Sequence, residues 1–513
     1  MKYSNISCWL NNWGLITAFV ITKLLIHFLT NSNYEIHRDG FLYIELGKHL
    51  HWGYYSVPPS IALFADISRF IFGDTDFGIR FFPAIIGAIS LVIIGIMVKE
   101  MGGGKMAQFI ALLAFLTSPA FLRSNTLFQP VSFNQFYWLL IAFLIFRLIH
   151  TERPIYWIWI GIIAGLAFLN KYSVVFYLAA FFISILLTNS RKWLKTYYPY
   201  LSGCIALLLA LPNLIWQHQH HWPVIIHMRE LAETQLIHVR IDLFLLEQLL
   251  MNLPALLIWI SGLIFILFTR EGKKYRILGL IYILVLLQLI ILRGKHYYTL
   301  GLYSMLFAFG GYILVRWFHG RLQFIRYIII GLIIILAIFV LPISLPVMKP
   351  DQYVRFMRSI GMEKNQRWED GRYHELPQDY ADMIGWKELT GIVRDAYYSL
   401  TPEQREHCTI FANNYGEAGA INFYGQNFGL PNVISFHDSY LYWAPDSIAD
   451  EYLIKVGESD DLVEMYHDVQ IIGRISTPYA REYGVPVYIF KNPKVDVDKY
   501  YQERLHQERS SQK

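Results

Sequence analysis

The chain has 513 residues, of which 55% are hydrophobic and only 16% are charged. Because the apolar residues form long runs in the first two-thirds, this composition excludes an ordinary soluble protein and indicates a polytopic membrane protein. The formal net charge of +5 is modest. Basic residues in short loops account for it, and we expect no nucleic-acid partner. The three cysteines show neither metal-site spacing nor an obvious disulfide pairing.

About eleven apolar runs come near the ~20 residues that a helix needs to cross a bilayer. The first run lacks a cleavage site of small residues, which indicates a retained helix and not a removable signal peptide. The predicted membrane helices occupy residues 12–30, 79–98, 106–122, 132–150, 155–170, 173–189, 197–215, 244–268, 277–292, 297–317 and 325–346.

Charge in the short loops predicts the orientation of these helices. Alternate loops are rich in basic residues, and cytoplasmic loops are enriched in Lys and Arg. We therefore expect the N-terminus inside and, with an odd number of helices, the C-terminal part outside. The basic residues of the predicted inner loops are Lys99 and Lys105; Arg147 and Arg153; Arg191, Lys192 and Lys195; Arg270, Lys273, Lys274 and Arg276; and Arg316, Arg321 and Arg326.

Two predicted outer loops are too long to be simple turns. The loop at 31–78 contains amphipathic segments around Tyr43–Leu50 and Ser60–Phe72, which we expect to lie on the membrane surface. The second loop spans 216–243.

The composition changes at about residue 350. Residues 350–500 are rich in Asp, Glu, Asn, Gly and Tyr, and short strand-like runs alternate with helical stretches. This pattern is typical of a compact α/β domain. Residues 501–513 are charged, and we expect them to be disordered. The predicted organisation is thus a membrane domain at 1–349, an α/β domain and a short tail.

Asp39 is the leading catalytic candidate. It follows His37 and Arg38 at the predicted outer membrane face, where a carboxylate is costly unless it is used or paired. Such a carboxylate can act as a general base on an acceptor hydroxyl. The alternative is that Asp39 caps a helix starting at Phe41, since Asp is a favoured N-cap residue.

Two groups of basic residues lie at predicted outer ends of helices. Lys171, followed by Tyr172, could hold a lipid phosphate, although snorkelling toward the interface explains a lone lysine better. Arg293, Lys295 and His296 form a tighter cluster. That cluster favours an anionic partner over interfacial anchoring.

Three other polar segments have two interpretations each. Gln129 precedes a helix that begins with hydroxyl and amide residues, which suits either a polar ligand or helix capping. His218, His220 and His221 fit an interfacial loop better than a metal site, because no carboxylate or Cys partner is evident. The segment 413–420 suits either a carbohydrate-facing surface or an ordinary strand–helix turn.

Together these features resemble the bacterial branch of the dolichyl-phosphate-mannose protein mannosyltransferase superfamily, which includes the lipid A aminoarabinose transferases and has the GT-C fold. The resemblance covers roughly residues 10–320. It depends on Asp39 early in the first outer loop, on Pro58-Pro59 after the surface segments, on the sequence GLAFLNKY at 165–172 and on GKHYY at 294–298.

The resemblance implies a fold of about eleven transmembrane helices with a C-terminal soluble domain, and a role for each candidate. Asp39 is the implied catalytic base, acting with inversion on a sugar linked to polyprenyl phosphate. The implied donor-phosphate residues are Lys171, Tyr172, Arg293, Lys295 and Tyr298. The implied substrate-binding residues are His37, Arg38, Tyr43, Gln129 and His296. No metal ligand or cofactor is expected, although divalent-metal dependence stays open.

Two positions depart from the pattern of the family. Several relatives have an acidic residue and a lysine before the proline of the first loop, where this chain has Ser56 and Val57. Many also have an acid at the start of the fourth helix, where this chain has Gln129-Pro130-Val131. These departures bear on the acceptor and on how it is activated.

We therefore expect an integral membrane glycosyltransferase of the bacterial inner membrane, with its active site and C-terminal domain on the periplasmic side. Its implied partners are a polyprenyl-phosphate-linked sugar donor, a lipid, glycan or protein acceptor, and membrane lipids. One alternative is a transporter or flippase, which predicts ionisable residues near mid-membrane and inverted repeats. Another is a non-catalytic scaffold, which would tolerate the loss of Asp39.

Overall fold

The structure is a computed structural model, and it describes residues 3–30, 33–364, 366–449 and 451–511. The chain forms two compact units, each assembled from segments that are distant in sequence. The first unit comprises Met1–Asn31, Arg80–Leu214 and Glu233–Met348, and the second comprises Ser32–Ile79, Ile215–Ala232 and Lys349–Lys513. Whereas we expected a single division near residue 350, both long outer loops contribute to the unit that contains the C-terminal segment.

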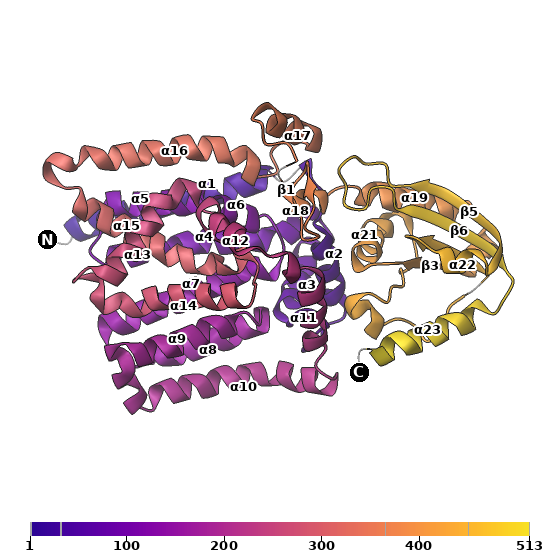
Figure 1. The fold of residues 1–513 in the computed structure, drawn as a ribbon, viewed down its shortest axis with the longest axis horizontal. Coiled ribbons are helices and arrows are strands. Elements are labelled where there is room, and N and C mark those ends of the chain that lie inside the picture. The colour runs from indigo at the N-terminus through magenta and orange to yellow at the C-terminus, as the bar shows by residue number, and fades with distance from the viewer. Residues whose placement is uncertain (1–2, 31–32, 365, 450, 512–513) are drawn as a thin grey trace. The chain divides into compact units, whose positions relative to one another are not determined.

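The first unit is built of helices (Figure 1). Its helices are α1 (Tyr3–Thr30), α4 (Asp76–Glu100), α5 (Lys105–Thr117), α6 (Pro119–Ser124), α7 (Pro130–Thr151), α8 (Ile155–Asn170), α9 (Val174–Leu187), α10 (Tyr198–Gln219), α12 (Ile241–Leu250), α13 (Leu256–Phe268), α14 (Arg276–Ile291), α15 (Tyr303–Trp317) and α16 (Phe324–Ser344). Short 3-10 turns include η2 (Asn189–Lys195), η4 (Leu253–Ala255) and η6 (His296–Leu302).

Among the described residues, 7 helices are long and apolar enough to cross a membrane, or up to 9 if each of two bent helix pairs is one span. The bent pairs are Val174–Leu187 with Asn189–Lys195, and Ile241–Leu250 with Leu253–Phe268. Two shorter apolar helices, α5 and α8, correspond to the remaining predicted runs. At about 1.5 Å per residue they fall short of a bilayer core of about 30 Å. The predicted polytopic helical fold is confirmed, and the count of full-length spans is lower than expected.

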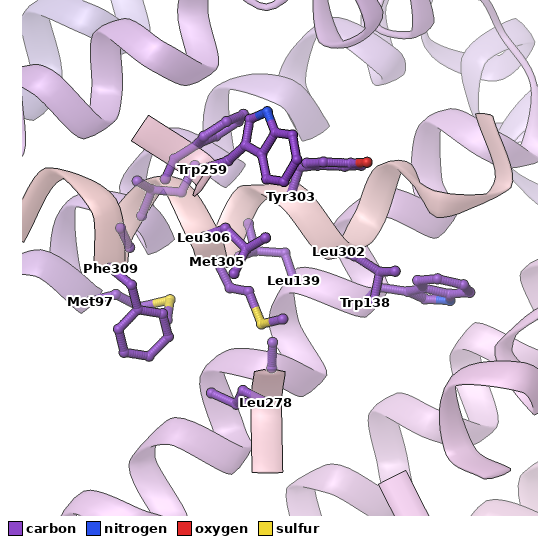
Figure 2. Packing of buried hydrophobic residues seen from close by; sticks show 14 of the residues in the cluster. Met97, Trp138, Leu139, Trp259, Leu278, Leu302, Tyr303, Met305, Leu306 and Phe309 are labelled. Atoms are coloured by element: carbon purple, nitrogen blue, oxygen red, sulfur yellow. The ribbon is translucent and has the colours of Figure 1, made fainter. Parts of the chain in front are cut away.

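The core of the first unit is a continuous set of apolar side chains. Figure 2 shows Trp259 beside Tyr303, with Met305 and Leu306 next to Leu139. The rings of Trp259 and Tyr303 meet edge to face, with 5.4 Å between their centroids. The backbones of α13 and α15 approach closely, because a Cβ at Gly310 would lie 1.9 Å from the Ile258 carbonyl oxygen. Small residues such as glycine let two helices pack closely. Close packing matters in a membrane, because the hydrophobic effect contributes little to helix association there.

The second unit contains a four-stranded sheet (Figure 1). Its strands are arranged in the order β3-β4-β6-β5. The first pair is parallel, and the other two pairs are antiparallel. Successive side chains of a strand point to opposite faces of the sheet. Ile410, Ile454 and Ile489 are paired across three strands and form one buried row on the same face. The strands are β3 (Cys408–Ala412), β4 (Tyr452–Val456), β5 (Tyr466–Arg474) and β6 (Pro486–Pro493), with a separate pair β1 (Gln366–Arg367) and β2 (Tyr373–His374).

Helices cover this sheet, and the predicted α/β character of the C-terminal segment is confirmed. Within the unit, α19 packs against the sheet and against α21. The helices of the unit are α2 (Arg38–Lys48), α3 (Ser60–Phe72), α11 (Pro223–Thr234), α17 (Pro350–Ser359), α18 (Gln378–Ala381), α19 (Trp386–Tyr398), α20 (Pro402–Glu406), α21 (Tyr415–Tyr424), α22 (Asp460–Val463) and α23 (Val497–Ser511).

The two amphipathic segments of the first loop are helical, but only one has an open apolar face. Helix α3 buries Ile61 and Ala65 and exposes Leu63 and Phe70, as a helix on a membrane surface does. In contrast, every residue of α2 from Gly40 to Gly47 is buried, because α3 and α21 both pack against it.

The C-terminal tail differs from the prediction of disorder, because α23 extends to Ser511. Tyr501 and Leu505 are buried four residues apart on one face of this helix. The Tyr501 hydroxyl donates a hydrogen bond of 2.7 Å to the Pro445 carbonyl. The sequence-based prediction missed this helix because charged residues surround the two apolar positions, Tyr501 and Leu505.

Candidate active site

The site begins with the local structure around Asp39. Helix α2 starts at Arg38, and its N-cap is His37, whose Nδ1 accepts the backbone N–H of Asp39 at 3.1 Å. Asp39 is therefore not the cap, and the capping alternative is wrong for this residue. Its carboxylate lies in the first turn, where the helix dipole favours a negative charge.

A tyrosine from the C-terminal segment contacts the Asp39 carboxylate. The Tyr415 hydroxyl donates a hydrogen bond of 2.8 Å to Oδ1. Oδ2 lies 3.9 Å from His37 Nδ1, and the side chain of Asp39 remains 29% exposed. The carboxylate is thus oriented by a neutral donor and still reaches the surface of the unit.

Two glycines let α21 approach α2 closely enough for this contact. A Cβ at Gly416 would lie 2.6 Å from Arg38 Cγ, and one at Gly419 would lie 2.7 Å from Phe41 Cβ. Helix α21 begins after Asn414, whose side chain accepts the N–H groups of Gly416 and Glu417. The strand–helix turn after β3 therefore aims Tyr415 at the first turn of α2.

A second carboxylate lies on the far side of His37. His37 Nε2 is 3.6 Å from Asp382 Oδ2, and Arg481 Nη1 is 3.3 Å from Asp382 Oδ1. The Asp382 carbonyl accepts the backbone N–H of Arg38 at 2.9 Å. In its neutral form His37 carries its proton on Nε2, toward Asp382, because Nδ1 accepts the N–H of Asp39.

The pKa values of the Asp39 and Asp382 carboxyl groups are shifted in opposite directions. Burial raises the pKa of Asp39, but His37, the Tyr415 hydrogen bond, Arg38 and Arg481 together lower it below its ordinary value. Burial also raises the pKa of Asp382, and there it prevails over Arg481, His37 and Arg38. The side chain of Asp382 is only 4% exposed. Asp39 is thus the ionised, accessible carboxylate of the pair, as a base or nucleophile must be.

Of the three predicted substrate-binding residues in the second unit, His37 lies beside Asp39 and Arg38 lies beside Tyr415. His37 caps α2, and the Arg38 guanidinium lies over the Tyr415 ring at 4.7 Å, with Nε 4.0 Å from Glu482 Oε1. Tyr43 is only 6% exposed within α2. Its ring presents little surface to a substrate.

The predicted donor-phosphate residues belong to the other unit, where the structure brings together two of the motifs. Lys171 follows α8, and its Nζ lies 5.1 Å from the centre of the Tyr298 ring. The Tyr172 hydroxyl donates to Asn213 Oδ1 at 3.1 Å. The motifs at 165–172 and 294–298 thus share one cation–π contact.

The remaining predicted residues of that unit have other surroundings. Lys295 Nζ donates to Gln235 Oε1 at 2.6 Å, and the His296 carbonyl accepts from Gln248 at 3.4 Å. Arg293 is exposed and has a positive φ of 52°. Gln129 is the N-cap of α7, although its side chain makes no capping hydrogen bond.

Sequence reasoning missed Asp382 and Arg481, and it considered Tyr415 only as part of a carbohydrate-facing segment. No local pattern connects Tyr415 with Asp39, because 376 positions separate them. One signal was present: Gly416 and Gly419, three residues apart on a helix, indicate a close approach by another segment.

Comparisons with known proteins agree with this architecture. A family model described as dolichyl-phosphate-mannose-protein mannosyltransferase matches residues 56–216. Lipid A galacturonosyltransferase RgtD of Rhizobium johnstonii is 23% identical over 220 residues, which are 43% of this chain and 46% of that protein. The chain thus matches about half the length of this curated relative.

The solved structures extend the likeness to nearly the whole chain. ArnT from Cupriavidus metallidurans bound to undecaprenyl phosphate superposes with a TM-score of 0.64 at 12% identity, covering 93% of this chain and 98% of that chain. The same protein in the apo state gives 0.62 at 13% identity, with the same coverage.

The structure is that of a polytopic helical membrane protein with the GT-C fold and a C-terminal sheet domain. The resemblance inferred from the sequence, to the polyprenyl-phosphate-sugar glycosyltransferases of the dolichyl-phosphate-mannose protein mannosyltransferase superfamily, is confirmed.

Proposed function

We propose that this protein is an integral membrane glycosyltransferase that transfers a sugar from a polyprenyl-phosphate donor to a hydroxyl acceptor at the periplasmic face of a bacterial inner membrane. One observation carries the proposal: an ionised, partly exposed carboxylate, Asp39, is held by a hydrogen bond from Tyr415 in a chain with the GT-C fold. The undecaprenyl phosphate named with the ArnT structure supports the donor class.

The chemistry follows from the charge on Asp39. The acceptor hydroxyl attacks the anomeric carbon, the bond from that carbon to the phosphate oxygen breaks, and the electron pair leaves with polyprenyl phosphate. Asp39 accepts the hydroxyl proton. Because its lowered pKa makes it a weak base, proton transfer accompanies attack, when the hydroxyl becomes acidic. Direct displacement inverts the anomeric centre.

Negative charge develops on the phosphate as it leaves, and nearby cations stabilise that charge. Lys171, Arg293 and Lys295 are the residues that the resemblance assigns to this role. The contact between Lys171 and Tyr298 supports the assignment, because a ring at 5.1 Å holds the ammonium group without neutralising it. Lipid A galacturonosyltransferase activity in a relative supports a lipid-class acceptor.

The experiment that tests this function uses membranes containing the wild-type protein. A panel of labelled polyprenyl-phosphate sugars is supplied with lipid extract, and both free polyprenyl phosphate and the anomeric configuration of the product are followed. Release of polyprenyl phosphate with an inverted product is the expected result. Movement of intact donor between leaflets without release of polyprenyl phosphate would instead support a flippase. Neither release nor movement with any donor would support a scaffold.

A further inference from the structure

We propose that Tyr415 is a positioning residue that fixes the orientation of the Asp39 carboxylate, so that the C-terminal segment completes the catalytic site. This inference depends on the proposed function of Asp39 as the base. It assigns to the C-terminal segment a specific role in the reaction, through one hydroxyl group.

The two oxygens of Asp39 have different surroundings. Oδ1 accepts the Tyr415 hydroxyl at 2.8 Å, whereas Oδ2 is 3.9 Å from His37 Nδ1, beyond hydrogen-bond distance. A donor on Oδ1 restricts rotation of the carboxylate and so holds the base in one orientation. Orientation of this kind lowers the entropic part of a reaction barrier.

Tyr415 is itself fixed from three sides. Its ring stacks on His437 with centroids 4.9 Å apart, and the Arg38 guanidinium lies 4.7 Å above it. Its backbone is set by the first turn of α21, after the Asn414 cap. Burial and Asp39 keep the pKa of Tyr415 well above its ordinary value, so the hydroxyl remains a donor.

The start of α2 and the residues just before it are hydrogen-bonded to the C-terminal segment. The N–H of Glu35 donates to the Met383 carbonyl at 2.8 Å, and the N–H of Arg38 donates to the Asp382 carbonyl at 2.9 Å. The Glu35 carboxylate accepts the N–H of Trp386 at 2.7 Å. The backbone just before Asp39 is thus held by residues 382–386, and the backbone of Tyr415 is held by the first turn of α21.

Removing the hydroxyl gives a definite pH signature. The titratable and charged groups that act on Asp39 are the N-cap His37, Arg38 on α2, Tyr415 on α21, Asp382 after α18, and Arg481 before β6. Because the Tyr415 hydrogen bond lowers the pKa of Asp39, its loss raises that pKa. A base must be ionised, so the acid limb of the pH–rate profile moves to higher pH.

The test compares Tyr415→Phe with Tyr424→Phe. Tyr424 lies on the same helix, and its hydroxyl donates to a different carboxylate, Asp76, at 3.5 Å. Polyprenyl phosphate release is measured against pH. We expect Tyr415→Phe to move the acid limb up by about one pH unit and to lower the plateau rate, and Tyr424→Phe to leave both unchanged.

A second substitution keeps the hydroxyl in place and changes only its strength as a donor. Replacement of Tyr415 by a fluorinated tyrosine retains the ring and makes the hydroxyl a stronger donor, so the acid limb should move down. An acid limb that moves in neither variant overturns the positioning role, even if Asp39→Asn is inactive. Absence of release by the wild type with every donor overturns the proposed function itself, so the two failures are distinguishable.

Discussion

Arg481 and Asp382 form an ion pair in which one guanidinium nitrogen lies 3.3 Å and 3.5 Å from the two carboxylate oxygens. The carboxylate is buried, whereas Arg481 is 31% exposed. His37 Nε2 lies 3.6 Å from Oδ2 of the same carboxylate. The pair therefore stabilises the residue that caps α2 and, through the cap, the backbone of Asp39.

The substitution Arg481→Met tests this pair through its pH dependence. Arg481 lowers the folded-state pKa of Asp382, so its removal raises that pKa further above the ordinary value. The folded state then binds a proton more tightly than the unfolded state, and stability falls as the pH rises above the unfolded value of about 3.9.

We therefore expect Arg481→Met to have a lower melting temperature than the wild type in detergent. The difference should be larger at neutral pH than near pH 4. An equal deficit at both pH values would contradict this account. The control is Arg394→Met, because Arg394 pairs with its exposed neighbour Asp395 and such surface pairs contribute little.

The substitution Gly416→Ala tests the close approach of α2 and α21. An added Cβ would lie 2.6 Å from the Arg38 side chain, and such overpacking costs about 1–3 kcal/mol. Gly391→Ala on α19 is the matched control, because nothing lies within 4 Å of its Cβ position. It should leave stability unchanged or raise it by about 0.4–1 kcal/mol. Equal unfolding temperatures for the two variants would count against the packing of α2 on α21.

The substitution Lys171→Met tests the proposed phosphate contact. Loss of a charge-assisted contact with a phosphate costs about 1.5–3 kcal/mol, which corresponds to at least a tenfold weakening of donor binding. We expect the KM for the donor to rise accordingly, while Lys192→Met, at a lysine 68% exposed, leaves it unchanged. An unaltered KM in Lys171→Met would support snorkelling.

Much of the fold could be predicted because it depends on local patterns. Apolar runs of about 20 residues place the membrane helices, and each of the eleven predicted runs corresponds to a helix or a bent helix pair. The length of α5 was less predictable, because the Pro119 that begins α6 ends an otherwise continuous apolar stretch.

The site was only partly predictable, because its partners come from distant segments. Asp39 was evident as a carboxylate beside a membrane helix. Its contact with Tyr415 and the pairing of His37 with Asp382 depend on tertiary packing over more than 300 residues of sequence. Charge and turn chemistry specify neither contact. The burial of α2 could not be predicted for the same reason, because α21, which packs against it, belongs to the C-terminal segment.

The most direct test of the central claim compares Asp39→Asn with Asp66→Asn in membranes, following release of polyprenyl phosphate from the donor that the wild type uses. Asparagine keeps an acceptor oxygen for Tyr415 but cannot take a proton, and Asp66 is a 44% exposed carboxylate in the same loop. We predict that Asp39→Asn loses about 10²-fold or more of turnover with normal expression and donor binding, while Asp66→Asn retains it. Wild-type turnover in Asp39→Asn would contradict the role of Asp39 as the base.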